Sequence, residues 1–439
     1  MMRSGNRHGM AAVAVLAPVL WAGMDAGAAT EVDLQSAVFR AKPAVVMIAV
    51  EVAAVATVRC GAGRAKTVRP APLGRVGSGF IIHPDGWVVT NGHVVQLFHE
   101  RNETSLAQAL LERAVEEGCG PALRGLAGKA RRQRLRAMAA DQSNGGGVEI
   151  KKSLHVSLSN GRMYSAEIKV YSPPAFVEVG TTRDATGATR KEFGKDVAIL
   201  KIPARDLPVV RLADRSTGLH LGQALFVIGF PGVVLDHDLL SVASRFEPSV
   251  TVGRVSGFKQ DLGGQRVIQT DAAITQGNSG GPAFDDRGNV IGAATFISLK
   301  GNQMVQGFNF LVPVETIREG AGRAGVAPQP ESAFTRLWNR GVELYLADKH
   351  VRALNHMKAA SDLHPGFPDV ERVKEDCSAK YREQPYLHRE GVQWVVMGVG
   401  TLAAVVSLWF GGRLAAAARR RRLQQMIREE LLASGPPRG

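Results

Sequence analysis

Residues 77–95 read GSGFIIHPDGWVVTNGHVV. Two short apolar runs in this stretch flank the pair Asp85-Gly86, whose residue types tolerate the positive φ angles of a tight hairpin turn. Similar short runs rich in β-branched residues, separated by Gly, Asn and Asp, recur between residues 45 and 312. Short strands at this spacing are typical of a β-sandwich or barrel. The sequence therefore predicts a mostly β fold for this part of the chain.

A helical pattern interrupts the strands over residues 98–149. Leu106, Leu110 and Leu111 recur there at helical spacing, and Pro121 opens a second helical stretch that carries six basic side chains. We therefore expect a helical insertion in the β domain. A shorter polar insertion is expected over about 173–194.

Composition and charge exclude several classes of protein. The chain has 439 residues, 45% hydrophobic and 21% charged, which argues against a disordered or fibrous protein. Its three cysteines form no Cys-x-x-Cys pair, so no zinc site is indicated, and no cofactor is expected. The net charge of +14 is concentrated in residues 59–75 (five basic, no acidic) and 411–439 (seven Arg, two Glu). No aromatic residues interleave with either run, so nucleic acid is not an expected partner.

The N-terminus has the organisation of a secretory signal. Arg3 and Arg7 precede an apolar stretch over 10–21, and small residues follow over 26–29. This arrangement predicts a signal peptide over residues 1–29, cleaved near Ala28 or Ala29.

A second segment predicts a membrane anchor. Residues 392–412 number 21 and carry no charge, which is enough to span the hydrocarbon core of a bilayer. Arg413 and the run 419–422 follow at once, and positive charge favours the cytoplasmic side. We therefore expect a transmembrane helix over 392–412 and a basic cytoplasmic tail over 413–439. With the signal peptide, this topology leaves everything from about 30 to 390 outside the cytoplasm.

Three short strings carry candidate catalytic residues. His93 follows the Thr90-Asn91-Gly92 string, Asp196 precedes an apolar strand, and Ser279 lies in a Gly-Asn-Ser-Gly-Gly string over 277–281. The order His, Asp, Ser matches that of chymotrypsin-type enzymes. A serine hydroxyl needs a base to become a nucleophile, and a buried carboxylate orients an imidazole for that task. The backbone N–H groups of Gly277 and Ser279 are the expected oxyanion hole.

Several motifs together resemble the HtrA/Deg group of trypsin-fold serine proteases. They are 77–82, 87–93, Asp196 to Lys201, 269–274 leading into 277–282, and 307–313. The resemblance covers roughly 32–320, apart from the two insertions. It implies a domain over 30–320 built of two six-stranded antiparallel β-barrels with the catalytic residues in the cleft between them. It also implies that His93 is the general base, Asp196 its orienting partner and Ser279 the nucleophile.

Two features depart from that group. Thr275-Gln276 stands where the group often has Asn-Pro, and no PDZ domain follows residue 320. Residues 331–385 instead resemble one tetratricopeptide repeat and the first helix of a second. Because about three repeats are needed for independent stability, this segment must pack on the protease, on a partner or on another copy. The alternative is a spacer that only lifts the protease off the membrane.

The resemblance also suggests where the substrate binds. Six residues before Ser279 stands Ala273, the position that in trypsin-like enzymes lies at the base of the pocket for the residue before the scissile bond. Ala273 and the other predicted pocket residues, Ile274, Ala294 and Thr295, carry no carboxylate. A basic substrate side chain buried in this pocket would therefore stay unpaired. Cleavage after small or medium apolar residues such as Val, Ala or Ile is therefore expected.

These observations favour a serine endopeptidase of the bacterial inner membrane, single-pass, with its protease domain in the periplasm, acting on misfolded or exported proteins. Two alternatives are a catalytically idle trypsin fold that serves as a scaffold and a hydrolase of esters. In an exported protein disulfides persist, and we hypothesise a bond between Cys60 and Cys119.

Overall fold

The computed structural model describes residues 26–61, 63–99, 103–143, 147–183, 189–235, 241, 243–261, 263–300, 303–383 and 390–433. The predicted signal peptide over 1–29 lies almost wholly outside the described residues. Its last residues begin helix α1 (Ala26–Ala41), which continues through the short helix η1 (Lys42–Ala44) into the first strand.

The first barrel is built from an eight-stranded sheet with the order β6-β5-β1-β3-β4-β10-β7 and β2 paired to β1. The Ala166 N–H donates to the Leu154 carbonyl at 3.0 Å and continues the β5–β6 pairing, and the chain passes through Ala166 from β6 into β7, the two ends of the strand order. The strands are β1 (Val45–Val58), β2 (Lys66–Val68), β3 (Leu73–His83), β4 (Trp87–Thr90), β5 (Val148–Leu158), β6 (Met163–Ser165), β7 (Glu167–Ser172) and β10 (Val197–Lys201).

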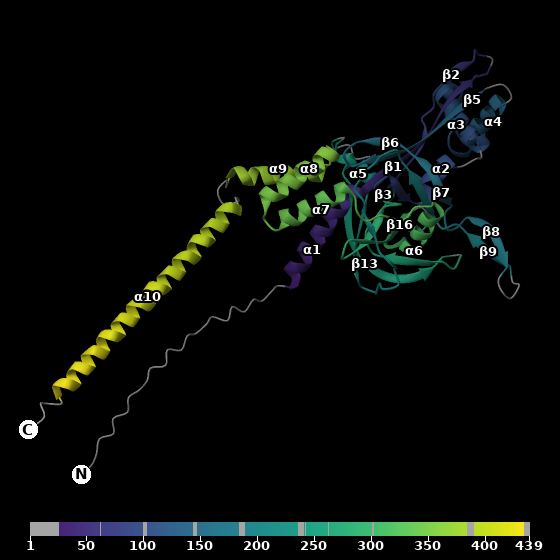
Figure 1. Cartoon of the computed structure of the whole chain (residues 1–439). Helices are drawn as coiled ribbons and strands as arrows, with labels where there is room; N and C mark the ends of the chain where they lie inside the picture. Colours follow the sequence, from purple (N-terminus) through teal and green to yellow (C-terminus); the bar gives the residue numbers. More distant parts are fainter. Residues whose placement is uncertain are drawn as a thin grey trace, which may run out of the picture.

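The second barrel closes on itself, because β16 and β17 pair at the two ends of the order β16-β15-β12-β13-β14-β17. Strand β11 adds to β16 in parallel. The strands are β11 (Arg211–Leu212), β12 (Ala224–Gly229), β13 (Ser249–Gln260), β14 (Arg266–Thr270), β15 (Pro282–Asp285), β16 (Asn289–Lys300) and β17 (Gln303–Pro313), with the short helices α5 (Gly232–Leu235) and η3 (Ala243–Phe246) between β12 and β13. Figure 1 shows this barrel below the first. The expected pair of β-barrels is thereby confirmed, although the eight-stranded and seven-stranded sheets, the latter with one parallel strand, differ from the six antiparallel strands expected of each barrel.

One hydrophobic cluster joins the two barrels. Phe80 and Ile199 enter it from the first barrel, Phe226 and Phe284 from the second, and all four are fully buried. The Phe226 and Phe284 rings stack with their centroids 4.8 Å apart. Helix α6 (Val314–Arg323) covers the cluster with its apolar face. Because burying one such side chain contributes about 1.5–3 kcal/mol, this cluster holds the two barrels in one relative position.

Helices lie between β4 and β5, where the sequence predicts an insertion. They are α2 (Gly92–His99), α3 (Glu103–Gly118), η2 (Gly120–Leu123) and α4 (Gly128–Ser143), and a separate hairpin of β8 (Glu178–Arg183) and β9 (Thr189–Phe193) projects between β7 and β10. Leu111 and Val115 of α3 pack on Val58 of β1 in a small core of their own. Cys60 and Cys119 form a disulfide with Cα atoms 5.5 Å apart, in the usual range. The hypothesised bond is therefore present and ties β1 to the insertion.

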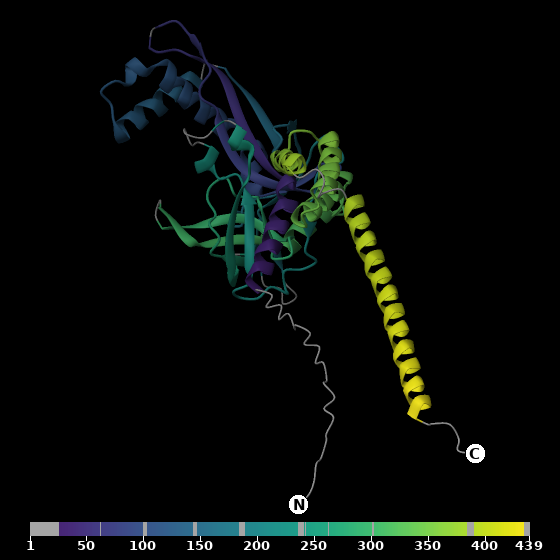
Figure 2. The same cartoon turned by 90° about the vertical axis from the view of Figure 1, so that its left-hand side faces the viewer.

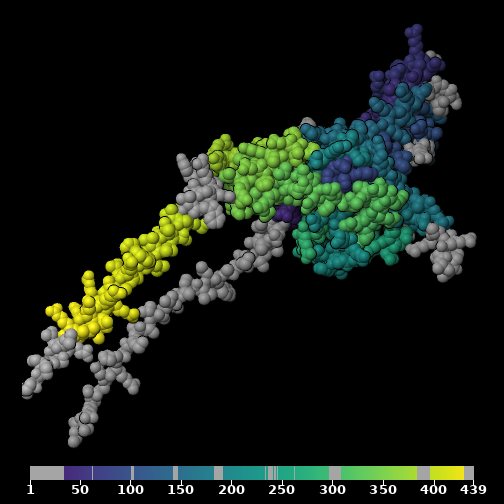
Figure 3. All heavy atoms as spheres, in the orientation of Figure 1, coloured from purple at the N-terminus to yellow at the C-terminus, as the bar shows by residue number. Residues whose placement is uncertain are grey.

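The segment after the two barrels forms three helices, α7 (Ala333–Leu346), α8 (His350–Leu363) and α9 (Pro368–Glu383). Phe334 and Trp338 share one buried cluster with Ile48 and Leu200 of the first barrel. The Trp338 indole N–H donates to the Phe39 carbonyl at 2.8 Å. The segment therefore packs on the protease, as Figure 3 shows. Its assignment to the tetratricopeptide repeats stays a prediction.

Helix α10 (Glu390–Ala433) leads away from the body in both views (Figures 1 and 2). Its portion Val396–Glu429 is exposed and, among the described helices, is the one long and apolar enough to cross a membrane by length and composition. It overlaps the predicted span over 392–412. In the same views the helical insertion lies at the opposite end of the molecule.

The buried side chain of Lys42 forms ion pairs that connect the helical segment to the barrels, and its removal should lower the free energy of unfolding. Lys42 is 8% exposed, and its Nζ lies 3.0 Å from both Asp369 of α9 and Glu247. Lys42→Ala leaves the buried Asp369 carboxylate with the more exposed Arg372, 3.3 Å away, as its remaining cation, a change that costs about 1–3 kcal/mol. We expect the variant to unfold at a lower urea concentration than the wild-type protein, as measured by tryptophan fluorescence. As a control, Arg340→Ala breaks an exposed pair with Glu343 and should cost under about 1 kcal/mol. Equal shifts for the two variants would contradict this.

Candidate active site

The three catalytic candidates come from both barrels. His93 lies in the first turn of α2, directly after β4, and Asp196 directly precedes β10, which pairs with β4. Both therefore belong to the first barrel. Ser279 lies between β14 and β15 of the second barrel. The cluster that joins the barrels thus also sets where Ser279 stands relative to the other two.

His93 and Asp196 form a close pair. The imidazole Nδ1 lies 2.9 Å from Oδ2 and 3.1 Å from Oδ1 of Asp196, and the backbone N–H of His93 donates to Oδ1 at 2.8 Å. The carboxylate is 3% exposed. Because it engages Nδ1, it favours the tautomer with hydrogen on Nδ1 and leaves Nε2 as the acceptor that a general base needs.

Other residues hold this carboxylate in place. The Thr295 hydroxyl donates to Oδ2, and the Asn91 amide donates to the Asp196 carbonyl at 2.9 Å. Asp196 has a φ of 51°, in a region that Asp adopts more readily than most residues. Burial by itself raises the pKa of Asp196, but the His93 charge and the hydrogen bonds from His93 and Thr295 outweigh it. The pKa of Asp196 therefore lies below its ordinary value, and the group is ionised at neutral pH.

Thr295 also links the pair to Ser279. Its carbonyl accepts the Ser279 hydroxyl at 3.2 Å, while its side chain contacts Asp196. The structure therefore links Ser279 through Thr295 to Asp196, and through Asp196 to His93. In this state the serine hydroxyl faces a backbone carbonyl, and catalytic hydrogen bonds are often formed fully only when substrate is bound.

The loop before Ser279 requires a glycine at position 277. Gly277 has a φ of 96°, and a Cβ there would stand 2.3 Å from the Phe230 carbonyl oxygen, so only glycine fits. The Gln276 carbonyl accepts the Gly232 N–H at 2.7 Å. Since carbonyl and N–H point in opposite directions across a trans peptide, the Gly277 N–H points away from Gly232. Gln276, at the position where HtrA-type sequences often have Pro, is therefore anchored through its backbone.

Ser78 holds this loop from the first barrel, a role that sequence reasoning missed. Its buried hydroxyl donates to the Gly277 carbonyl at 2.7 Å and accepts the Phe230 N–H at 2.9 Å. Its backbone N–H donates to the Ser279 carbonyl at 2.8 Å. The available signal was a small hydroxyl residue between Gly77 and Gly79, but its partners Phe230 and Gly277 lie 152 and 199 positions further along the chain.

The predicted pocket residues lie in different surroundings. Ala273 is exposed, whereas Ile274 and Ala294 are buried in the core of the second barrel. Thr295 differs from expectation, because its hydroxyl is committed to Asp196 and supports the catalytic carboxylate rather than facing a substrate. The assignment of the other three to a substrate pocket stays a prediction.

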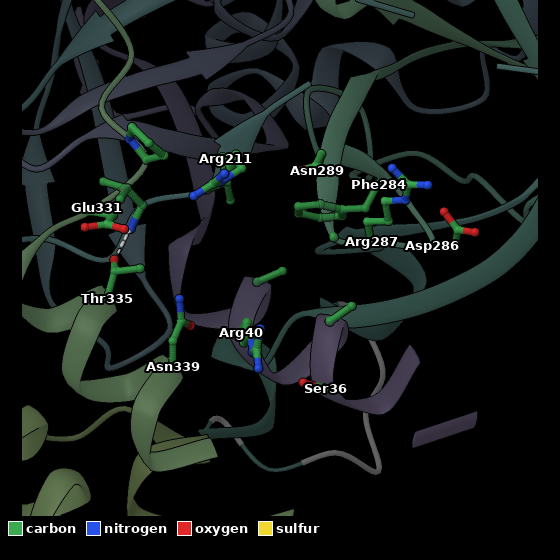
Figure 4. Close-up of a pocket in the computed structure, with 16 residues that line it drawn as sticks. Ser36, Arg40, Arg211, Phe284, Asp286, Arg287, Asn289, Glu331, Thr335 and Asn339 are labelled. Carbon is green, nitrogen blue, oxygen red and sulfur yellow. Dashed lines mark hydrogen bonds between the residues drawn. The ribbon is translucent and has the colours of Figure 1, made fainter. Parts of the chain in front are cut away.

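A hollow of 540 Å³ lies between α1, α7 and the turn before β16. Arg40, Arg211 and Asn339 line it, as Figure 4 shows. None of the three catalytic candidates contributes to its wall, so it is separate from the candidate active site.

Comparison with known proteins gives consistent results. Residues 77–292 match the family described as trypsin-like peptidase domain. Protease Do-like 5 of Arabidopsis thaliana chloroplasts is 37% identical over 152 residues, 30% of this chain and 43% of that protein. A probable periplasmic serine endoprotease DegP-like of Halomonas elongata is 28% identical over 296 residues, 67% of this chain and 44% of that protein. A solved structure of the HtrA-type protease AlgW with decapeptide is 22% identical, with a TM-score of 0.38, covering 66% of this chain and 67% of that one. The chain spans less than half the length of these curated relatives.

Removal of the Ser78 hydroxyl should impair catalysis more than binding. Ser78→Ala deletes the bonds to Gly277 and Phe230, so the oxyanion loop loses its fixed position. We expect kcat for peptide hydrolysis to fall by roughly ten- to a hundredfold with little change in KM. Ser157→Ala, at another buried serine of the first barrel, is the matched control and should leave kcat near the wild-type value. A rise in KM with unchanged kcat would refute the positioning role.

Proposed function

We propose that this chain, whose residues 77–292 form a trypsin-like peptidase domain of the HtrA/Deg type, is an active serine endopeptidase of misfolded or exported proteins. The single observation that carries the proposal is the His93–Asp196 pair, joined through Thr295 to Ser279. A buried carboxylate on Nδ1 leaves Nε2 of His93 to act as the base, and a serine held on the neighbouring Thr295 supplies the hydroxyl that acyl transfer requires.

The proposed reaction begins when substrate draws the Ser279 hydroxyl away from the Thr295 carbonyl. Nε2 of His93 takes the hydroxyl proton while Oγ attacks the scissile carbonyl, and the imidazolium then gives the proton to the leaving amine. Asp196 stays ionised throughout and stabilises the imidazolium. The N–H groups of Gly277 and Ser279 stabilise the oxyanion of each tetrahedral intermediate. Water then hydrolyses the acyl-enzyme by the same steps.

The proposed location is the periplasmic face of a bacterial inner membrane. It is supported by the signal-like N-terminus, by the apolar portion of α10 followed by Arg419 to Arg422, and by the names of the DegP-like relatives. Under the positive-inside rule the arginines stay in the cytoplasm, and the barrels stand on the other side.

The proposed substrates are extended segments with a small or medium apolar residue before the scissile bond. Ala273 brings no charge to the predicted pocket, and the nearby Asp271 uses its carboxylate to accept the Arg254 N–H at 2.6 Å. A basic side chain would therefore find no carboxylate at position 273, and Oδ1 of Asp271 is directed to the backbone of β13. The idle-scaffold alternative is not favoured, because the His93–Asp196 pair is intact.

A fluorophosphonate probe and a denatured protein substrate test the proposal together. Wild-type protein should react with the probe and cleave the substrate, mainly after Val, Ala or Ile, whereas Ser279→Ala should do neither. The matched control is Ser256→Ala, at an exposed serine of β13, which should behave like wild type. Folded wild-type protein that neither reacts nor cleaves would rule out the enzyme, and cleavage mainly after Arg or Lys would rule out the pocket.

A further inference from the structure

Strand β3 brings a cation to the rim of the candidate active site. Ser78 and Gly77 adjoin the nucleophile, since a Cβ on Gly77 would lie 3.1 Å from the Ser279 carbonyl oxygen. Two residues earlier, the exposed Arg75 donates from Nη1 to the His93 carbonyl at 3.3 Å. The guanidinium thus stands directly beside the residue that carries the imidazole.

The charge of Arg75 is free to meet a substrate. Within the described residues, Arg75 forms no ion pair. Its cross-strand partner on β1 is Val50, which is buried, and Glu51 follows on the opposite face of the strand. The Glu117 carboxylate from α3 accepts the Ala71 N–H at 2.9 Å instead.

A second guanidinium, from the helical insertion, contacts the segment that leads into β3. Arg113 of α3 donates from Nη1 to the carbonyls of Ala71 and Pro72 at 3.0 and 2.9 Å. These bonds hold the approach to β3 in place beneath the helical insertion. Arg69, just before it, is exposed as well. The insertion therefore holds the segment that leads into β3, the strand from which Arg75 reaches His93.

The position of Arg75 identifies the half of the substrate that it faces. Asp196 engages Nδ1 and the N–H of His93, and Thr295 adjoins Asp196, whereas Arg75 engages the His93 carbonyl. The leaving amine must receive its proton from the imidazole, so the residues that follow the scissile bond lie beside His93. Arg75 is thus placed next to the leaving half of the substrate.

We propose that Arg75 selects substrates with an aspartate or glutamate among the first three residues after the scissile bond. The inference rests on the proposed endopeptidase function and deepens it. A guanidinium pairs well with a carboxylate, and its charge persists at every physiological pH. Because the pair is exposed, the preference is modest, roughly two- to fivefold in kcat/KM at low salt. Salt weakens it by screening.

Sequencing of all cleavage sites in a digest of denatured proteins tests this proposal. Wild-type protein should show acidic residues enriched about two- to fivefold in the three positions after the cut, and less so in 0.5 M salt. Arg75→Gln should lose the enrichment, and Arg75→Glu should favour Lys and Arg instead. The matched control is Arg287→Gln, at an exposed arginine of the distant β15–β16 turn, which should keep the wild-type profile.

The outcomes separate this inference from the function on which it rests. Cleavage with the same profile for wild type and Arg75→Gln would overturn the role of Arg75 and leave the endopeptidase standing. Absence of cleavage and of fluorophosphonate labelling in folded wild-type protein would overturn both.

Discussion

The hydrogen bonds of Ser78 are the contact on which the candidate active site depends. A serine in the first barrel holds the carbonyls of Gly277 and Ser279 and the N–H of Phe230, all in the second. Apart from this link and the Thr295–Asp196 hydrogen bond, the nucleophile and its base are held together by the apolar packing between the barrels, which is not directional. Hydrogen bonds are directional, so those of Ser78 set the orientation of the loop around Gly277 as well as its distance from the first barrel. The buried site makes them stronger than they would be in water.

The rest of the molecule reinforces that arrangement from three sides. The inter-barrel cluster around Phe226 and Phe284 resists separation of the barrels, and α6 seals it. On the histidine side, Thr295 bridges between Asp196 and Ser279. On the far side of the first barrel, α7 to α9 share its core through Phe334 and Trp338 and carry the ion pair of Lys42 with Asp369. The helices that follow the protease are therefore part of its packing, at the end of the body from which α10 departs.

The local elements and the three candidate catalytic residues could be predicted from the sequence. The contacts that could not be predicted all join residues that lie far apart in the chain. The strands around Asp85-Gly86, the helices after His93 and the apolar span before Arg413 each follow from local periodicity and turn chemistry. His93, Asp196 and Ser279 were identifiable because glycines and chain order accompany them. The roles of Ser78 and Thr295 were not, since a single hydroxyl in a strand has no periodic signature and its partners come from the other barrel or a distant loop. The docking of α7 likewise depends on Trp338 meeting Phe39, a contact between residues nearly 300 positions apart.

The central claim is that two barrels, fixed at Ser78, present one site that stabilises an oxyanion on Ser279. A crystal structure of the wild-type protein after reaction with a peptidyl phosphonate tests it most directly. The account predicts phosphorus bonded to Ser279 Oγ, a phosphonyl oxygen within hydrogen-bond distance of the Gly277 and Ser279 N–H groups, and Ser78 still bonded to the Gly277 carbonyl. An adduct whose oxygen points away from both N–H groups, or a loop detached from Ser78, would contradict it.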